Sequence, residues 1–161
     1  NGKNVRLQLW DIAGQERYSG FTQIYFKEAV AAFVVFDLNR PATFHSIARW
    51  KRDLDANTKS EDGQNIPVVL LANKSDCYDP DDPKNGPDGD GVALGGMDEV
   101  CRQHGFVGWF STSAKDNVNV DEAALFLVRC VMGRSLGTVN RDGDVSLSGE
   151  ESTKHKKCTI L

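Results

Sequence analysis

Three short groups of polar residues follow apolar stretches of the sequence, and their types suit a phosphorylated ligand. The first group is Asp11, Gly14 and Gln15, in the stretch WDIAGQE. An aspartate at a strand end can hold Mg²⁺ through a water, a glycine lets a backbone N–H approach a phosphate, and a glutamine can orient an attacking water. The alternative is a solvated turn with a flexible glycine. The other two groups decide between these interpretations.

The second group is Asn73, Lys74 and Asp76, in the stretch NKSD. A carboxylate after a buried strand can accept two N–H bonds from the edge of guanine, a bidentate match worth roughly 1 to 3 kcal/mol of base discrimination. The asparagine can tie neighbouring loops together and touch the base, and the lysine stem can lie along the ring. Taken alone, NKSD is explained better as a set of good turn formers.

The third group is Ser113, Ala114 and Lys115. The backbone N–H of Ala114 could reach a base carbonyl, while its two neighbours shape the loop. This signal is weak in isolation. Because the three groups each follow a strand in the expected order, and ligands of open parallel sheets lie at the carboxyl ends of the strands, we expect all three on one edge of the sheet.

The elements that must position these groups alternate between strands and helices. Apolar runs predict strands at residues 5–11, 29–38, 67–74 and 106–115. Helical spacing predicts a short helix ending near Lys27, a helix that starts at Pro41 or Thr43 and continues past Leu54, and helices around residues 97–104 and 120–131. This alternation indicates an α/β fold with a parallel sheet.

Length and composition fit one domain with a tail. The 161 residues are 40% hydrophobic and 26% charged, which suits a globular domain over residues 1–133 and a disordered tail over residues 134–161. A net charge of −4 gives no basic field, so nucleic acid is not an expected partner. Four scattered cysteines indicate a reducing cytosol, and no apolar run approaches the roughly 20 residues of a membrane span.

Together, WDIAGQERY, NKSD and SAK resemble the Ras-like small GTPases, and the continuation IYFKEAVAAFVVFD resembles the Rab branch. Ile12, with KEAVAAFVVFD, LLANKSD, HGFVGWF and TSAKDNVNVDEAA, is most similar to the Rab subgroup of lysosome-related organelles and phagosomes. The resemblance covers residues 5–133. It implies a P-loop NTPase-like small GTPase domain, with GTP or GDP and Mg²⁺ as cofactors and with an exchange factor, a GTPase-activating protein and effectors as partners.

The resemblance also implies roles for single residues. Gln15 matches the catalytic, water-positioning glutamine, and Asp11 matches the aspartate that holds Mg²⁺ through a water. Trp10 and Tyr25 match two aromatic residues that face effectors, although both could equally be core residues. The implied nucleotide-binding residues are Asp11, Gly14, Asn73, Lys74, Asp76, Ser113, Ala114 and Lys115.

One departure concerns the phosphate-binding part of the family. The sequence contains no G-x-x-x-x-G-K-[ST], and the family's first two strands, first helix and switch I are absent, so we expect them before Asn1. In the family the first strand lies between the strands ending at Asp11 and Asp37. Its absence is expected to leave central backbone groups unpaired or to force a new pairing. We therefore expect this fragment to be poorly stable and inactive alone.

The sequence ends in KHKKCTIL, where Cys158 and the final leucine match a geranylgeranylation motif. Lys154, Lys156 and Lys157 add attraction to anionic lipid, so the chain has the two signals that stable anchoring requires. Most Rabs end in paired cysteines, and a single one departs from that pattern. The expected location is the cytoplasmic face of an endomembrane, either a lysosome-related organelle, an endosome or a phagosome, in exchange with the cytosol.

A loop rich in aspartate and two other functions are alternatives to this interpretation. The loop 77–96 is rich in aspartate, but its spacing does not match a calcium-binding EF-hand loop and favours a solvated insertion. The rival function is a non-catalytic, lipid-anchored interaction module derived from a Rab. A nicotinamide-binding domain is a third, weaker alternative, because no glycine-rich turn follows a first strand.

Overall fold

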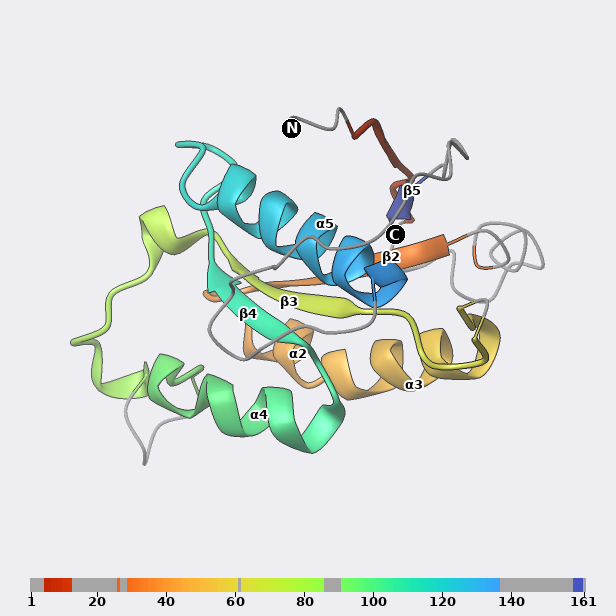
Figure 1. Ribbon diagram of the computed structural model, residues 1–161. Helices are drawn as coiled ribbons and strands as arrows, with labels where there is room; N and C mark the ends of the chain where they lie inside the picture. The colour runs from red at the N-terminus through yellow and green to blue at the C-terminus, as the bar shows by residue number, and fades with distance from the viewer. Residues whose placement is uncertain are drawn as a thin grey trace.

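The computed structural model describes residues 5–12, 26, 29–60, 62–85, 91–136 and 158–160. A single sheet forms the centre, with α2, α3 and α4 on one side and α5 on the other (Figure 1). Within the described part of the chain, no helix is long and apolar enough to cross a membrane.

The sheet has five strands in the order β1-β5-β2-β3-β4, and every strand pairing is parallel. The strands are β1 (Leu7–Leu9), β2 (Ala29–Asp37), β3 (Val68–Asn73), β4 (Gly108–Ser111) and β5 (Cys158–Ile160). The register aligns the ends of β2 and β3, where Asp37 is opposite Asn73. The predicted parallel α/β architecture is confirmed, and the central strands have nearly the predicted bounds.

Successive side chains of the buried strands point to opposite faces of the sheet, so the core has two layers. Ala32, Val34 and Phe36 of β2 face a cluster that includes residues of α3 (Ile47–Asn57) and α4 (Met97–His104). On the opposite face, Ala31 and Val69 pack with Leu127 of α5 (Val120–Leu136). Both faces of β2 and β3 are covered except at Val35, which is 56% exposed, and the two strands are accordingly continuous apolar runs rather than alternating ones.

The single helix predicted after β2 is divided into α2 (Pro41–Phe44) and α3. Pro41 begins α2, a position where its missing N–H costs nothing. The Thr43 hydroxyl donates to the carbonyl of Arg40, and Ser46 Oγ donates to the carbonyl of Ala42. Such side-chain bonds compete with regular helical bonding and accompany the break between the two helices.

Two described segments extend beyond the predicted domain boundary. Helix α5 continues to Leu136, past the predicted domain boundary at Gly133, and β5 lies between β1 and β2. This is the position for which the sequence analysis expected either unpaired backbone groups or a new pairing, and the structure shows a new pairing. Local composition indicated disorder, whereas the pairing partners of β5 come from distant segments.

The two ends of the aspartate-rich loop lie close together in the structure. It contains short 3₁₀ helices at Ser75–Cys77, Pro83–Asn85 and Leu94–Gly96. The Tyr78 hydroxyl donates to the carbonyl of Val92 over 2.7 Å, which joins the two ends of the excursion. The carboxylate of Asp82 pairs with Lys84 at 2.8 Å. Two further aspartates of this loop, Asp88 and Asp90, lie outside the described residues.

Candidate functional site

The predicted site groups lie after the carboxyl ends of parallel strands. Asp11 follows β1 and is exposed, Asn73 ends β3, and Ser113 follows β4. Direct contacts join the second and third groups, as described below. Gly14, Gln15 and Tyr25 lie outside the described residues, so the structure gives no geometry for the predicted catalytic glutamine.

Asn73 links β3 to the turn that follows β4. Its Oδ1 accepts a hydrogen bond from the backbone N–H of Ala114 at 3.1 Å and a longer one from Thr112 Oγ1 at 3.4 Å. The Thr112 carbonyl in turn accepts the N–H of Ser75 at 3.0 Å. The Ala114 N–H, which the sequence analysis directed at a base carbonyl, therefore already has a protein acceptor. The asparagine matches the predicted tie between neighbouring loops.

Asp76 is the acceptor at the centre of the site. Ser113 Oγ donates to its Oδ1 at 2.7 Å, Cys77 Sγ donates to Oδ2 at 3.2 Å, and Lys115 Nζ is 3.7 Å from Oδ2. The Ser113 hydrogen bond, together with the Cys77 bond and the Lys115 charge, holds the pKa of Asp76 below its ordinary value. Asp76 is therefore ionised at neutral pH, and an ionised carboxylate accepts hydrogen bonds only.

Lys74 connects this site to the end of β2. It adopts a left-handed backbone conformation, with φ of 66°, which turns the chain sharply as it leaves β3. Its Nζ lies 2.8 Å from Asp37 Oδ2, and its carbonyl accepts the Nδ2 of Asn39 at 3.2 Å. Burial raises the pKa of Asp37, but hydrogen bonds from Lys74 and Asn39 and the lysine charge outweigh it, so the net pKa is lowered.

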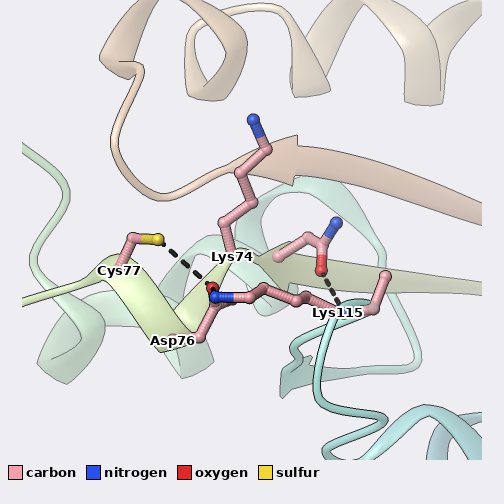
Figure 2. A pocket seen from close by; sticks show the side chains of 6 residues that line it. Lys74, Asp76, Cys77 and Lys115 are labelled. Atoms are coloured by element: carbon pink, nitrogen blue, oxygen red, sulfur yellow. Dashed lines mark hydrogen bonds and ion pairs between the residues drawn. The ribbon is translucent and has the colours of Figure 1, made fainter.

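Figure 2 shows how the four labelled side chains are directed. Lys115 extends toward Asp76, the Cys77 sulfur also points to Asp76, and Lys74 points away from it. The sequence analysis did not select Asp37 or Cys77. Asp37 could have been found from the same rule as Asn73, because it too ends a buried strand, and the register places the two residues opposite each other.

Six residues that end β3 or follow β3 and β4 surround an open hollow of about 320 Å³, which is near the lower end of the range for small-molecule sites. Guanine suits this hollow, because the acceptor oxygens of an ionised Asp76 can accept two N–H bonds from one edge of that base. The lining residues are Asn73, Lys74, Asp76, Cys77, Ala114 and Lys115.

Comparison with known proteins identifies the family of the chain. A family model described as "Ras family" matches residues 1–132. The chain belongs to the Ras family. Within it the chain is a Rab-family small GTPase of the Rab-32-like subgroup, because relatives that carry the name Rab-32 are up to 53% identical to it. The predicted family is confirmed.

Three relatives illustrate the similarity. "Ras-related protein Rab-32" of Sus scrofa is 47% identical over 155 residues, which are 95% of this chain and 65% of the relative. "Ras-related protein Rab-32A" of Dictyostelium discoideum is 42% identical over 162 residues, or 96% of this chain and 70% of the relative. "Ras-related protein Rab-7L1" of Rattus norvegicus is 41% identical over 131 residues, or 81% and 59%. This Rab chain thus spans roughly 60 to 70% of the length of these relatives.

An apolar surface adjoins the first predicted group in this Rab chain. Trp10 is 40% exposed and Leu9 is 65% exposed, and both lie at or just beyond the end of β1. Ile12 packs against the larger core cluster. Of the two interpretations left open for Trp10, a core aromatic and a residue facing a partner, the exposure favours the second.

Among the described residues, no group of three His, Cys, Asp or Glu side chains could hold a metal ion. Asp11 offers one carboxylate. Mg²⁺ is commonly bound by one or two carboxylates together with substrate phosphates and waters. The donor chemistry of Asp11 fits Mg²⁺ that arrives with a nucleotide.

Proposed function

We propose that this chain is the guanine-reading part of a Rab GTPase, a switch that binds and hydrolyses GTP and controls membrane trafficking. The observation that carries the proposal is the ionised Asp76 carboxylate, held by Ser113 at 2.7 Å on a hollow that Asn73 and Ala114 also line. Two hydrogen bonds fix the segment after β3 to the segment after β4. They run from the Ala114 N–H to Asn73 Oδ1 and from the Ser75 N–H to the Thr112 carbonyl.

Base selection follows from the hydrogen-bonding character of the carboxylate. Guanine offers N1–H and N2–H donors side by side, so both Asp76 oxygens can accept from it. Adenine has a lone pair at N1, which an ionised carboxylate repels. The Oδ1 atom of Asn73 is bonded to Ala114, which orients the amide so that Nδ2 is the group that can donate to a base nitrogen. The site therefore favours guanine.

The phosphate end of the ligand is assigned to Asp11, Gly14 and Gln15. Asp11 would hold Mg²⁺ through a water, and the ion supplies positive charge to the phosphate oxygens when it is bound. Gly14 would bring its backbone N–H to the terminal phosphate. Gln15 would orient the attacking water through its side-chain amide. The whole protein's hydrolysis of GTP is part of this proposal.

Membrane attachment is assigned to the end of the sequence. Cys158 would carry a geranylgeranyl group, and the neighbouring lysines would bind anionic lipid on the cytoplasmic face of an endomembrane. Exposed Trp10 and Leu9 offer an apolar surface for effectors, with Tyr25 as a third contributor. The proposed regulators are an exchange factor and a GTPase-activating protein.

Substitution of the carboxylate tests the base-reading role. We would measure saturation-transfer NMR signals from GDP, ADP and xanthosine diphosphate on the full chain, because this method detects weak binding. Asp76→Asn replaces one acceptor oxygen with a donor amide, which suits the C2 carbonyl of xanthine. The preference for GDP over xanthosine diphosphate should fall by roughly 1 to 3 kcal/mol, or about 5- to 150-fold.

The control is Asp116→Asn, which makes the same charge change in the same turn. Asp116 reaches Ser113 through its backbone N–H, which the substitution retains, and it does not line the hollow. An unchanged base preference in the Asp76 variant, or the same loss in the Asp116 variant, would contradict the assignment.

Calorimetry distinguishes the proposed GTPase function from the rival function, a non-catalytic interaction module. We expect tight GTP binding with Mg²⁺ only from a longer form of the chain that includes a phosphate-binding loop, and single-turnover hydrolysis that Gln15→Leu slows. A longer form that binds GTP but shows no hydrolysis would favour the interaction module. Micromolar GTP binding by the present chain would show that the proposed phosphate cradle is dispensable.

A further inference from the structure

Both oxygens of the Asp76 carboxylate are held by side-chain donors of the protein. Ser113 Oγ donates to Oδ1 at 2.7 Å, and Cys77 Sγ donates to Oδ2 at 3.2 Å. Lys115 Nζ is 3.7 Å from Oδ2 and its side chain is 75% exposed, so Lys115 acts on Asp76 as a charge and forms no directional hydrogen bond. Among the described residues, the Cys77 thiol is therefore the directional donor to Oδ2.

Recognition of guanine places a strict demand on the plane of this carboxylate. The last torsion of an aspartate side chain is broad, so one hydrogen bond restricts the carboxylate less than two do. The two oxygens of an ionised carboxylate offer about four lone-pair sites. Ser113 and Cys77 use one site on each oxygen, which leaves one on each for the N1–H and N2–H donors of guanine. A carboxylate held at both oxygens loses less freedom when the base binds.

The backbone places the thiol of Cys77 next to Asp76. Cys77 ends the 3₁₀ helix that begins at Ser75, and its N–H donates to the Lys74 carbonyl at 3.1 Å. On the other side, the N–H of Tyr78 donates to the Ser75 carbonyl at 3.2 Å. Cys77 also lines the hollow, and Figure 2 shows its sulfur directed at Asp76. The backbone is thus bonded on both sides of this thiol.

The protonation states of the two groups suit this contact. The hydrogen bonds from Ser113 and Cys77, with the Lys115 charge, lower the pKa of Asp76. The hydrogen bond to Asp76 and its negative charge raise the pKa of Cys77. At neutral pH the thiol therefore keeps its proton and donates to an ionised carboxylate, whereas a thiolate would repel that carboxylate.

We propose that Cys77 is a positioning residue for guanine recognition, whose thiol holds Oδ2 of Asp76 as Ser113 holds Oδ1. This inference rests on the proposed reading of guanine by Asp76. The base contacts the carboxylate, and Cys77 acts on the base through that carboxylate. The alternative is that the thiol competes with guanine for Oδ2. Removal of the thiol weakens guanine binding in the first case and strengthens it in the second.

A comparison of GDP with inosine diphosphate measures the positioning. Inosine diphosphate retains the N1–H of guanine and lacks its amino group, so the preference for GDP reports the second N–H bond to the carboxylate. In saturation-transfer NMR on the full chain, Cys77→Ala should lower this preference about 2- to 10-fold, which corresponds to one hydrogen bond. Cys77→Ser retains a donor and should keep most of the preference.

Ser75→Ala is the matched control for this comparison. Ser75 lies in the same 3₁₀ helix, its bond to Thr112 uses a backbone N–H that the substitution retains, and it does not line the hollow. Its preference for GDP should equal that of wild type. An unchanged preference in Cys77→Ala would overturn the positioning role, and an increased one would overturn it in favour of competition. Equal losses in Cys77→Ala and Cys77→Ser would overturn the role of the thiol as a donor.

Titration of Asp76 gives a readout that needs no nucleotide. NMR of isotope-labelled aspartate follows the ionisation of this carboxyl group in the full chain. The pKa of Asp76 should rise in Cys77→Ala, because a hydrogen bond to the ionised form is lost, and should stay low in Cys77→Ser and Ser75→Ala. An unchanged pKa in Cys77→Ala would overturn the contact. Absence of any GDP signal from the wild-type chain would refute the reading of guanine and with it the positioning role, while the titration would still decide whether the thiol holds the carboxylate.

Discussion

Asn73→Ala should destabilise the domain by removing the acceptor that joins β3 to the turn after β4. Asn73 Oδ1 accepts from Ala114 N–H at 3.1 Å and from Thr112 Oγ1 at 3.4 Å. A neutral intramolecular hydrogen bond contributes about 0.5 to 1.5 kcal/mol. Ala114 is exposed, so water can replace its lost acceptor, whereas Thr112 is only 2% exposed. The 3.4 Å length makes the Thr112 bond a weak one.

These terms together predict a loss of about 1 to 2 kcal/mol in the free energy of unfolding. For a chain of this size that corresponds to a fall in melting temperature of about 2 to 8 °C, measured by circular dichroism. Asn73→Asp is the matched variant, because it retains oxygen acceptors for both donors but lacks the amide N–H₂ that can donate to a base. It should keep most of the stability and lose guanine binding.

The pair of variants separates the structural role of Asn73 from its binding role. A melting temperature within 1 °C of wild type for Asn73→Ala would refute the argument that Asn73 ties the two segments together. Normal GDP signals in the saturation-transfer experiment with Asn73→Asp would refute a role for the amide group in base recognition. Loss of stability in both variants would show that the shape of the neutral amide, rather than its oxygen, stabilises the turn.

Two more predictions concern the core and the thiols. Leu70 is 0% exposed, so Leu70→Ala should lower the free energy of unfolding by about 2 to 5 kcal/mol. Leu125 is 57% exposed, so Leu125→Ala should change this free energy by less than about 0.5 kcal/mol. Urea unfolding measures both changes. The hydrogen bond to Asp76 and its negative charge raise the pKa of Cys77, and burial raises the pKa of Cys101 to about 11. Asp76→Asn removes that charge, so the pKa of Cys77 should fall and the fraction of its thiolate at pH 8 should rise. Iodoacetamide should therefore react faster with Cys77, while Cys101 should stay unreactive. An unchanged rate at Cys77 would contradict the assigned cause.

Much of the fold followed from local sequence patterns. The continuous apolar runs of β2 and β3 predicted buried parallel strands, and the pattern around residues 97–104 predicted α4. The division between α2 and α3 was missed because it depends on side-chain bonds from Thr43 and Ser46 that hydrophobic spacing does not reveal. Strand β5 was missed because its partners are distant in sequence and its own stretch is short and follows a polar segment.

The site was predictable to a similar extent. Asn73 ends a buried strand and Asp76 follows it, and the order of the motifs predicted that both lie near Ser113 and Ala114, to which they are bonded in the structure. The direction of the Lys74 side chain was not predictable, because it depends on Asp37, which lies opposite Asn73 only once the strand order is known. The acceptor of the Ala114 N–H was not predictable for a related reason, since it is a side chain from the neighbouring strand.

The bond between the Tyr78 hydroxyl and the Val92 carbonyl makes the intervening loop a module for engineering. Because its two ends are clasped, additional residues between them lengthen a surface excursion without separating β3 from α4. Doubling the length of a flexible loop costs only about 0.6 kcal/mol in closure entropy. A peptide tag or a sensor domain could therefore be grafted at this point while the hollow beside Asp76 keeps its lining.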